Sequence, residues 1–302
     1  MKVLLTGATG LVGSHIVKLL SKRGVSINYF TRTFKPTALE GGRAFLWNPD
    51  RLEWDAQAIE GVTHVINLAG ASIAERWTPA YKEEVLRSRV NSLKTLKLAL
   101  EQHPQHGNVR VLSASAIGCY ASDHEVQHGE QSAHLGNGFL ADVVQLWEEA
   151  AKALLPVTHS LCLLRIGIVL DRDQGALPKL MTPIKWGMGA PLGSGRQWQS
   201  WIHIDDLARL FVYLLDHDLG PIVNAVAPNA LRQNELTTLI ASTLNKPLWL
   251  PAIPEWVLRL MLGEMSAVVL QSQHVVSTAI AGSDFKFQFN SAKAALVELL
   301  TH

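Results

Sequence analysis

The chain has 302 residues, of which 48% are hydrophobic and 18% are charged, the proportions of a globular protein with one large domain and a smaller lobe. Its formal net charge of +1 and the lack of a long apolar run make nucleic acid and membrane unexpected partners. Two cysteines, Cys119 and Cys162, supply neither a disulfide framework nor a metal site, and no targeting leader precedes the first strand, so we expect a cytoplasmic protein without metal.

The first predicted elements are a strand over residues 2–5 and a helix over 14–23, joined by a glycine-rich turn. Three glycines in this turn follow the spacing G-x-x-G-x-x-G. Such spacing lets the backbone turn tightly, approach a pyrophosphate and direct the N–H groups of a helix start at the anion. We therefore predict a dinucleotide site that is formed by Gly7, Thr9, Gly10, Leu11, Val12 and Gly13.

Residues 25–31 are predicted to form the second strand, whose end meets the adenosine ribose in a dinucleotide-binding fold. An acidic residue at that point would bind the ribose 2′-hydroxyl, but this chain has Thr31 and Arg32 there, with Lys35 close behind. A guanidinium binds a 2′-phosphate well through its planar fork. The sequence thus favours NADP(H) over NAD, and the alternative is that Arg32 is a plain surface charge.

Strands and helices alternate through the rest of the first half, which predicts an α/β fold of the Rossmann type, a doubly wound parallel sheet with helices on both faces. The strand over 63–67 ends in small residues that would pass close to the cofactor, so Leu68, Ala69 and Gly70 are added to the predicted site. The other predicted elements are helices over 79–102 and 139–155, a strand over 111–116 and a central strand over 161–170.

The second half contains a glycine-rich loop over 187–195, which we interpret as a loop above a pocket. Arg196 and Trp198 follow it and are candidates for binding an anionic or ring-shaped part of a small-molecule substrate, with a salt bridge and core packing as the alternatives. Asp205 or Asp206 is expected to cap a helix over 207–215, and 233–245 and 254–263 are also predicted helices.

We divide the chain into a dinucleotide-binding domain over 1–170, to which 201–224 returns, and a smaller lobe from 171–200 and 225–302. A substrate would then lie between the two, above the strand ends.

Several motifs together give this chain a family resemblance. They are T-G-x-x-G-x-x-G at 6–13, N-L-A-G at 67–70, S-A-S at 113–115 and W-I-H-I-D-D at 201–206. The chain resembles the extended branch of the short-chain dehydrogenase/reductase superfamily. It is most similar to the "epimerase family" sub-branch, whose C-terminal domain of unknown function corresponds to the residues after about 250.

The resemblance implies an NAD(P)-dependent nucleoside-diphosphate-sugar epimerase-like protein. It also implies a homodimer through the helices 79–102 and 139–155. Arg89 lies in a segment typical of the sub-branch and is included as a phosphate ligand, whereas His203 corresponds to a motif residue with a structural role.

Active members of the superfamily use Ser, Tyr and Lys, with the lysine four residues after the tyrosine on one helix face. None of the four tyrosines of this chain is followed by lysine at that spacing. Phe139 and Val143 stand at the expected positions, and Ser115 alone is retained. Loss of a positioned acid or base costs roughly 10²–10⁴-fold in rate.

Three hypotheses remain open. The protein is an NADP(H)-dependent oxidoreductase or epimerase with a substituted acid or base, an NADP(H)-binding regulatory or interaction module, or a structural partner without cofactor; the intact glycine loop argues against the third. For the first hypothesis Ser115 and Tyr120 are the catalytic candidates, ahead of Asp123, His128 and Glu130. Turnover that depends on Ser115 or Tyr120 would distinguish it from the second.

Overall fold

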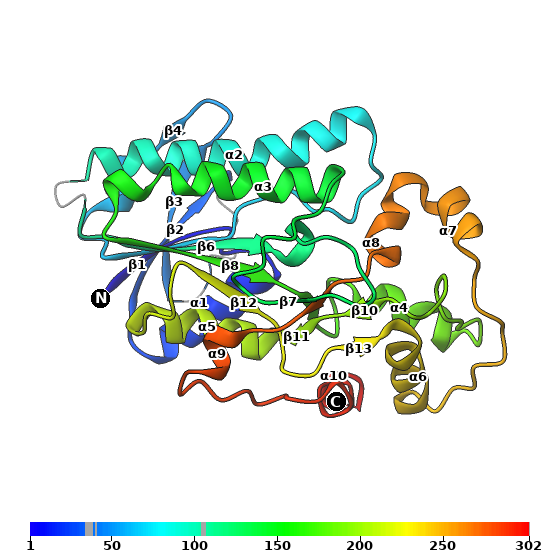
Figure 1. Cartoon of the computed structure of the whole chain (residues 1–302). Helices are drawn as coiled ribbons and strands as arrows, with labels where there is room; N and C mark the ends of the chain where they lie inside the picture. Colours follow the sequence, from blue (N-terminus) through cyan, green and yellow to red (C-terminus); the bar gives the residue numbers. More distant parts are fainter. Residues whose placement is uncertain (34–38, 40, 104–106, 302) are drawn as a thin grey trace.

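The computed structural model describes residues 1–33, 39, 41–103 and 107–301, so the predicted site residue Lys35 lies outside the described residues. Within them, eight strands form one sheet in the order β12-β8-β6-β5-β1-β2-β3-β4 (Figure 1). Every neighbouring pair is parallel except β3 and β4. The strands are β1 (Lys2–Thr6), β2 (Ser26–Thr31), β3 (Gly42–Asn48), β4 (Glu53–Trp54), β5 (His64–Asn67), β6 (Arg110–Ala116), β8 (Ser160–Ile166) and β12 (Ile222–Ala225).

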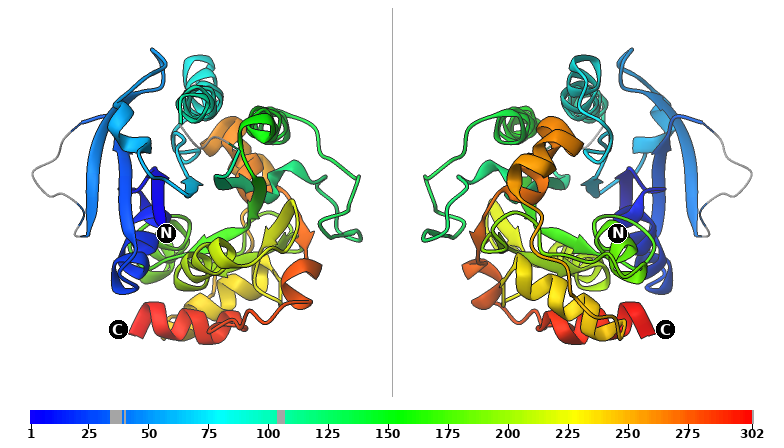
Figure 2. Two further views of the ribbon diagram at one scale, coloured as in Figure 1. Left: turned by 90° about the vertical axis from the view of Figure 1, so that its left-hand side faces the viewer. Right: turned by 90° about the vertical axis from the view of Figure 1, so that its right-hand side faces the viewer.

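Two helices cover each face of this sheet. Helices α2 (Pro79–Glu101) and α3 (Phe139–Lys152) lie side by side on one face, and α1 (Leu11–Lys22) and α5 (Ile204–Asp216) pack together on the other (Figures 1 and 2). The central strands are buried from both sides: Leu4, Ile66 and Leu112 are fully inaccessible. This arrangement confirms the predicted doubly wound α/β fold.

The predicted central strand over 161–170 is wrong in its extent. Strand β8 ends at Ile166, and β9 (Ile168–Leu170) pairs instead with β11 (Trp201–His203) in a separate two-stranded sheet. The break is at Gly167, where an added Cβ would lie 2.5 Å from the carbonyl oxygen of Ser200. The backbones approach too closely there for any side chain, and the chain changes partner.

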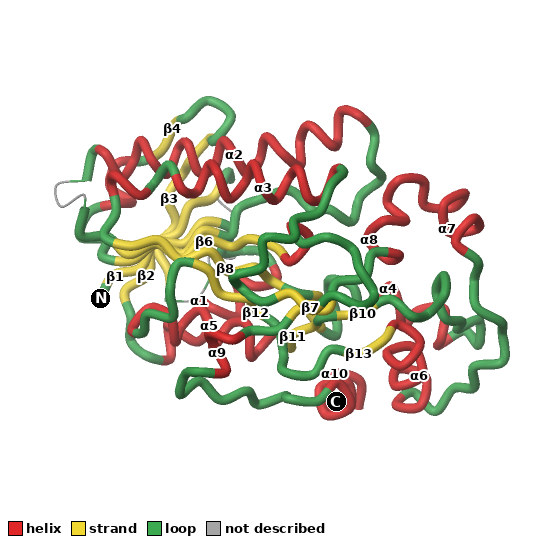
Figure 3. Tube along the Cα trace, viewed as in Figure 1, coloured by secondary structure: helices red, strands yellow, loops and turns green. Residues whose placement is uncertain are grey.

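A second hydrophobic core lies beside the first and is built mainly from α4 (Leu177–Lys185), α6 (Gln233–Thr243) and α10 (Ala292–Thr301). The C-terminal segment also returns to the first core, where Ile280 and Phe285 are buried. Figure 3 shows further short elements: β7 (Gln127–His128), β10 (Trp198–Gln199), β13 (Leu231–Arg232), α7 (Glu255–Leu262), α8 (Ala267–Leu270) and α9 (Thr278–Ala281). Strand β14 (His274–Val275) pairs with β7.

Helix α5 begins three residues earlier than predicted, and neither aspartate caps it. The side chain of His203 accepts a hydrogen bond from the N–H of Asp205, while its other ring nitrogen lies 3.0 Å from Glu298 of α10. The fully buried Asp206 accepts hydrogen bonds from the N–H groups of Gln288 and Phe289. His203 and Asp206 therefore anchor the C-terminal segment, as expected for a structural motif.

None of the helices in the described part of the chain combines the length and the apolar character that crossing a bilayer requires.

Candidate functional site

The glycine turn has the geometry of an anion cradle. Gly7 adopts a φ of +69°, which favours glycine, and a Cβ on Gly13 would lie 2.3 Å from the carbonyl oxygen of Gly7. Helix α1 then begins at Leu11 with Gly10 as its N-cap, no capping side chain and no acidic residue in its first turn. Its first N–H groups are consequently free to bind phosphate oxygens.

Three polar side chains tie the ends of neighbouring strands together behind this turn. The hydroxyl of Thr6 donates to the side-chain oxygen of Asn67 over 2.7 Å, and the amide of Asn67 donates to Ser113 over 3.0 Å. The N–H groups of Leu68 and Ala69 donate to the same Thr6 oxygen, each over 3.1 Å. These bonds fix the 68–70 turn against Gly7, and neither Thr6 nor Asn67 is among the predicted site residues.

Arg32 lies directly after β2, the strand that pairs with β1 in the sheet. Its side chain is exposed and enters no ion pair among the residues that the structure describes. Thr31 donates its hydroxyl to the carbonyl oxygen of Thr33 over 2.7 Å, which shapes the backbone around the arginine. The guanidinium is therefore available to an anionic ligand.

Ser115 ends β6 and belongs to a buried polar network. Its hydroxyl donates to Glu148 of α3 over 2.6 Å. The same carboxylate receives two hydrogen bonds from Arg165, each 2.8 Å long. Burial alone would raise the pKa of Glu148, but the bonds from Arg165 and Ser115 outweigh it and the pKa is lowered. Arg165 is thus paired, as a buried arginine in a central strand requires.

Tyr120 is part of the same network rather than of an open site. Its hydroxyl accepts a hydrogen bond from Arg165 over 2.9 Å and donates toward Asn224 and Gly129. Its side chain is only 1% exposed, and burial raises its pKa. Glu148 and Arg165 thus connect the two predicted catalytic residues, Ser115 and Tyr120. The hydroxyl of Tyr120 is already hydrogen-bonded within the protein.

The other acid–base candidates of the 118–138 loop also have structural partners. Asp123 accepts two backbone hydrogen bonds, from Glu125 and Val126. His128 lies between the hydroxyl of Ser132 and a backbone carbonyl. The carboxylate of Glu130 accepts hydrogen bonds from Ser277, Thr278 and the backbone of Asn224.

At the positions of the missing pair, Phe139 packs edge-on against Trp77, with ring centroids 4.8 Å apart, and Val143 is buried. The ammonium of Lys82, from α2, lies 5.2 Å from the ring of Phe139 and pairs with Glu264. Neither position on α3 carries a titratable group.

Trp198 is half-buried and its ring has two close neighbours. The guanidinium of Arg232 lies 3.7 Å from its ring centre, and His274 stacks on it at 4.1 Å. These contacts pack the ring within the protein, and its predicted role in stacking on a substrate stays a prediction. Arg196 is exposed and enters no ion pair within the described residues; its substrate role stays a prediction.

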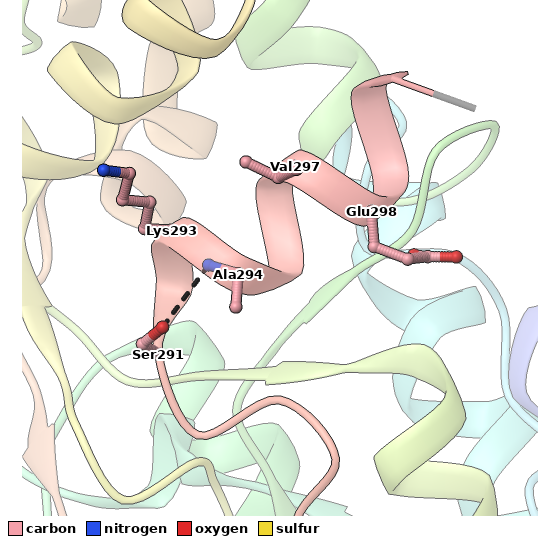
Figure 4. Close-up of a pocket in the computed structure, with 5 residues that line it drawn as sticks. All are labelled: Ser291, Lys293, Ala294, Val297 and Glu298. Carbon is pink, nitrogen blue, oxygen red and sulfur yellow. Dashed lines mark hydrogen bonds between the residues drawn. The ribbon is translucent and has the colours of Figure 1, made fainter.

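A separate depression lies on α10 and is lined by Ser291, Lys293, Ala294, Val297 and Glu298 (Figure 4). Ser291 accepts the N–H of Ala294, and Glu298 binds His203. This depression shares no residue with the predicted site. The described residues also contain no cluster of histidine, cysteine or acidic side chains that could hold a metal ion.

The sequence and the fold are both similar to those of known proteins. The profile of the NAD dependent epimerase/dehydratase family matches residues 3–138, and that of a domain of unknown function matches 253–299. An epimerase family protein of Staphylococcus haemolyticus is 36% identical over 98% of both chains.

Among solved structures, a human epimerase family protein crystallised with NADPH is 28% identical, covers 99% of both chains and has a TM-score of 0.87. A UDP-N-acetylglucosamine 4-epimerase from Bacillus cereus shares the fold, with a TM-score of 0.75 at 16% identity over 99% of this chain and 98% of the other.

Proposed function

This chain belongs to the NAD dependent epimerase/dehydratase family, in the group named epimerase family proteins, and from that premise we propose that it binds NADP(H). We further propose that it acts as an oxidoreductase or epimerase-like protein on a small carbonyl or nucleotide-sugar substrate.

One observation carries the cofactor proposal: the start of α1, which has no side-chain cap, and Arg32, which has no ion pair within the part of the chain that the structure describes, lie at the ends of adjacent parallel strands, β1 and β2. A Cβ on Gly13 would collide with the backbone of Gly7 and Ala8, so only glycine lets the start of α1 pack this closely on the turn. A guanidinium at the end of β2 complements the 2′-phosphate that distinguishes NADP from NAD. The human relative was solved with NADPH, which supports the same choice.

When bound, the nicotinamide ring supplies a hydride donor or acceptor. The chain itself offers Ser115 at the end of β6, with its proton directed to the ionised Glu148. The serine oxygen is then left as an acceptor for a substrate hydroxyl, but Ser115 is only 2% exposed, so a substrate reaches it only if the surrounding side chains move.

A second candidate function has its own support. Phe139 and Val143 carry no proton to transfer, and the hydroxyl of Tyr120 is fully engaged. These features favour an NADP(H)-binding regulatory or interaction module with little turnover.

Fluorescence titration with NADPH and NADH tests the cofactor proposal. We expect the wild type to bind NADPH about 10-fold or more tightly than NADH, because a charge-assisted bidentate contact is worth at least that factor. Arg32→Gln should abolish the preference, and Arg51→Gln, at an exposed arginine of the same domain, should keep it. Equal affinities, or no binding of either nucleotide, would contradict the proposal.

Turnover separates the two candidate functions. A panel of carbonyl compounds and nucleotide sugars is assayed with NADPH and NADP⁺, using the wild type and Ser115→Ala. Turnover that Ser115→Ala abolishes supports the enzyme, whereas NADPH binding without turnover supports the module.

A further inference from the structure

Arg89 projects from α2 to the turn that follows β5. Its Nη1 donates to the carbonyl oxygens of Ala71, over 3.1 Å, and Val85, over 2.8 Å. Its Cζ lies 5.0 Å from the ring centre of Trp147 on α3. A Cβ on Gly70 would lie 3.1 Å from that same Cζ, so the guanidinium rests directly against the turn.

The charge of Arg89 is uncompensated. Across residues 1–33, 39, 41–103 and 107–301 it enters no ion pair, and its Nε and Nη2 have no hydrogen-bond partner. Burial lowers its pKa to about 10. Arg165, the other arginine enclosed between helix and sheet, has Glu148 against it. A largely enclosed guanidinium with two unused N–H edges is the environment that an anionic ligand completes.

The sheet order decides which part of a dinucleotide lies near Arg89. Strand β1 is central, β2 is its neighbour on one side and β5 its neighbour on the other. A dinucleotide spreads its two halves over opposite sides of this strand. Arg32 follows β2, on the adenosine side, whereas the turn that supports Arg89 follows β5, on the opposite side.

We propose that the free N–H edge of Arg89 binds the phosphate and ribose oxygens of the nicotinamide half of the cofactor, with Trp147 holding the guanidinium in place. Arg89 then supplies from α2 a positive charge that α3, with Phe139 and Val143, does not offer. This inference rests on the proposed binding of NADP(H) and assigns a separate anchor to each half of the ligand.

Three ligands test it by isothermal titration. 2′,5′-ADP contains only the adenosine half, 2′-phospho-ADP-ribose adds the second phosphate and ribose, and NADPH adds the nicotinamide ring. Arg89→Gln should weaken NADPH and 2′-phospho-ADP-ribose about 10-fold or more and leave 2′,5′-ADP within about twofold. Arg87→Gln is the matched control, because Arg87 is an exposed arginine of the same helix that pairs with Glu84.

Arg89→Lys, which keeps the charge and loses the fork, should fall between the wild type and Arg89→Gln, and it takes the place of Arg89→Gln if that variant does not fold. An equal loss of affinity for all three ligands, or an unchanged affinity for NADPH in both Arg89 variants, would overturn the inference. The proposed function would still stand in that case, provided that the wild type binds NADPH. Failure of the wild type to bind NADPH would overturn both.

Discussion

At the scale of single residues, Gly13 lets the start of α1 pack directly on the backbone of the glycine turn. We predict that Gly13→Ala weakens NADPH binding at least about 10-fold and destabilises the protein by roughly 1–3 kcal/mol, because its Cβ would overlap the backbone of Gly7 and Ala8. Gly282→Ala is the control, since its nearest contact would be an ordinary 3.5 Å. Nucleotide titration and urea unfolding measure both effects, and a normal NADPH affinity in Gly13→Ala would refute the assignment of the loop.

The buried pair of Glu148 and Arg165 gives a second prediction at this scale. Arg165→Met should lower the free energy of unfolding by about 3–5 kcal/mol, because it leaves the carboxylate buried without its partner. The double variant Glu148→Leu with Arg165→Met removes both charges. Its free energy of unfolding should fall markedly less than that of Arg165→Met alone. Urea unfolding measures the free energy of unfolding of the wild type and both variants. A decrease of less than about 1 kcal/mol in Arg165→Met would show that the network does not stabilise the strand ends.

The sequence carries local signals at single residues, as for the three glycines and Arg32, whose role in binding a cofactor stays a prediction. The ion pair of Glu148 and Arg165 has no such local signal, because the two side chains meet only after α3 has packed on the sheet. The same applies to Trp198, whose ring contacts residues distant in the chain.

At the scale of elements, long helices and buried strands were predicted nearly at their observed bounds, as for α2 and β6. Strand β3 was not among the predicted elements, although its residues 44–47 form a short apolar run between the glycines at 41–42 and Pro49. Helix α4 was missed because it contains Pro183, which normally argues against a helix. The β8–β9 break could not be predicted, since it depends on the approach of the Ser200 backbone to Gly167.

Asp206 provides a prediction at the element scale. Asp206→Ala removes the acceptor of two backbone N–H groups and the partner of Arg209, so the segment that leads into α10 should open locally. We expect faster tryptic cleavage after Lys286 or Lys293 than in the wild type. Asp284→Ala, an exposed change in the same segment, is the control. Identical cleavage rates in Asp206→Ala and the wild type would show that the aspartate does not anchor this segment.

At the scale of the whole molecule, both cores depend on segments that cross between them, and the predicted dimer through α2 and α3 stays a prediction. Binding of NADPH should stabilise the fold as a unit, because a ligand of the native state alone adds about 2.7 kcal/mol at 100 times its Kd. We expect the Tm, measured by differential scanning fluorimetry, to rise by several degrees with NADPH and by less with NADH. A Tm that does not change with NADPH concentration would contradict cofactor binding.

The central claim is that the opening glycine loop binds a dinucleotide whose 2′-phosphate contacts Arg32. A crystal structure of the protein grown with NADPH tests it most directly. We expect the pyrophosphate at the start of α1 and the 2′-phosphate within hydrogen-bond distance of the Arg32 guanidinium. Density with no nucleotide in the loop, or a nucleotide whose 2′-phosphate lies away from Arg32, would contradict it.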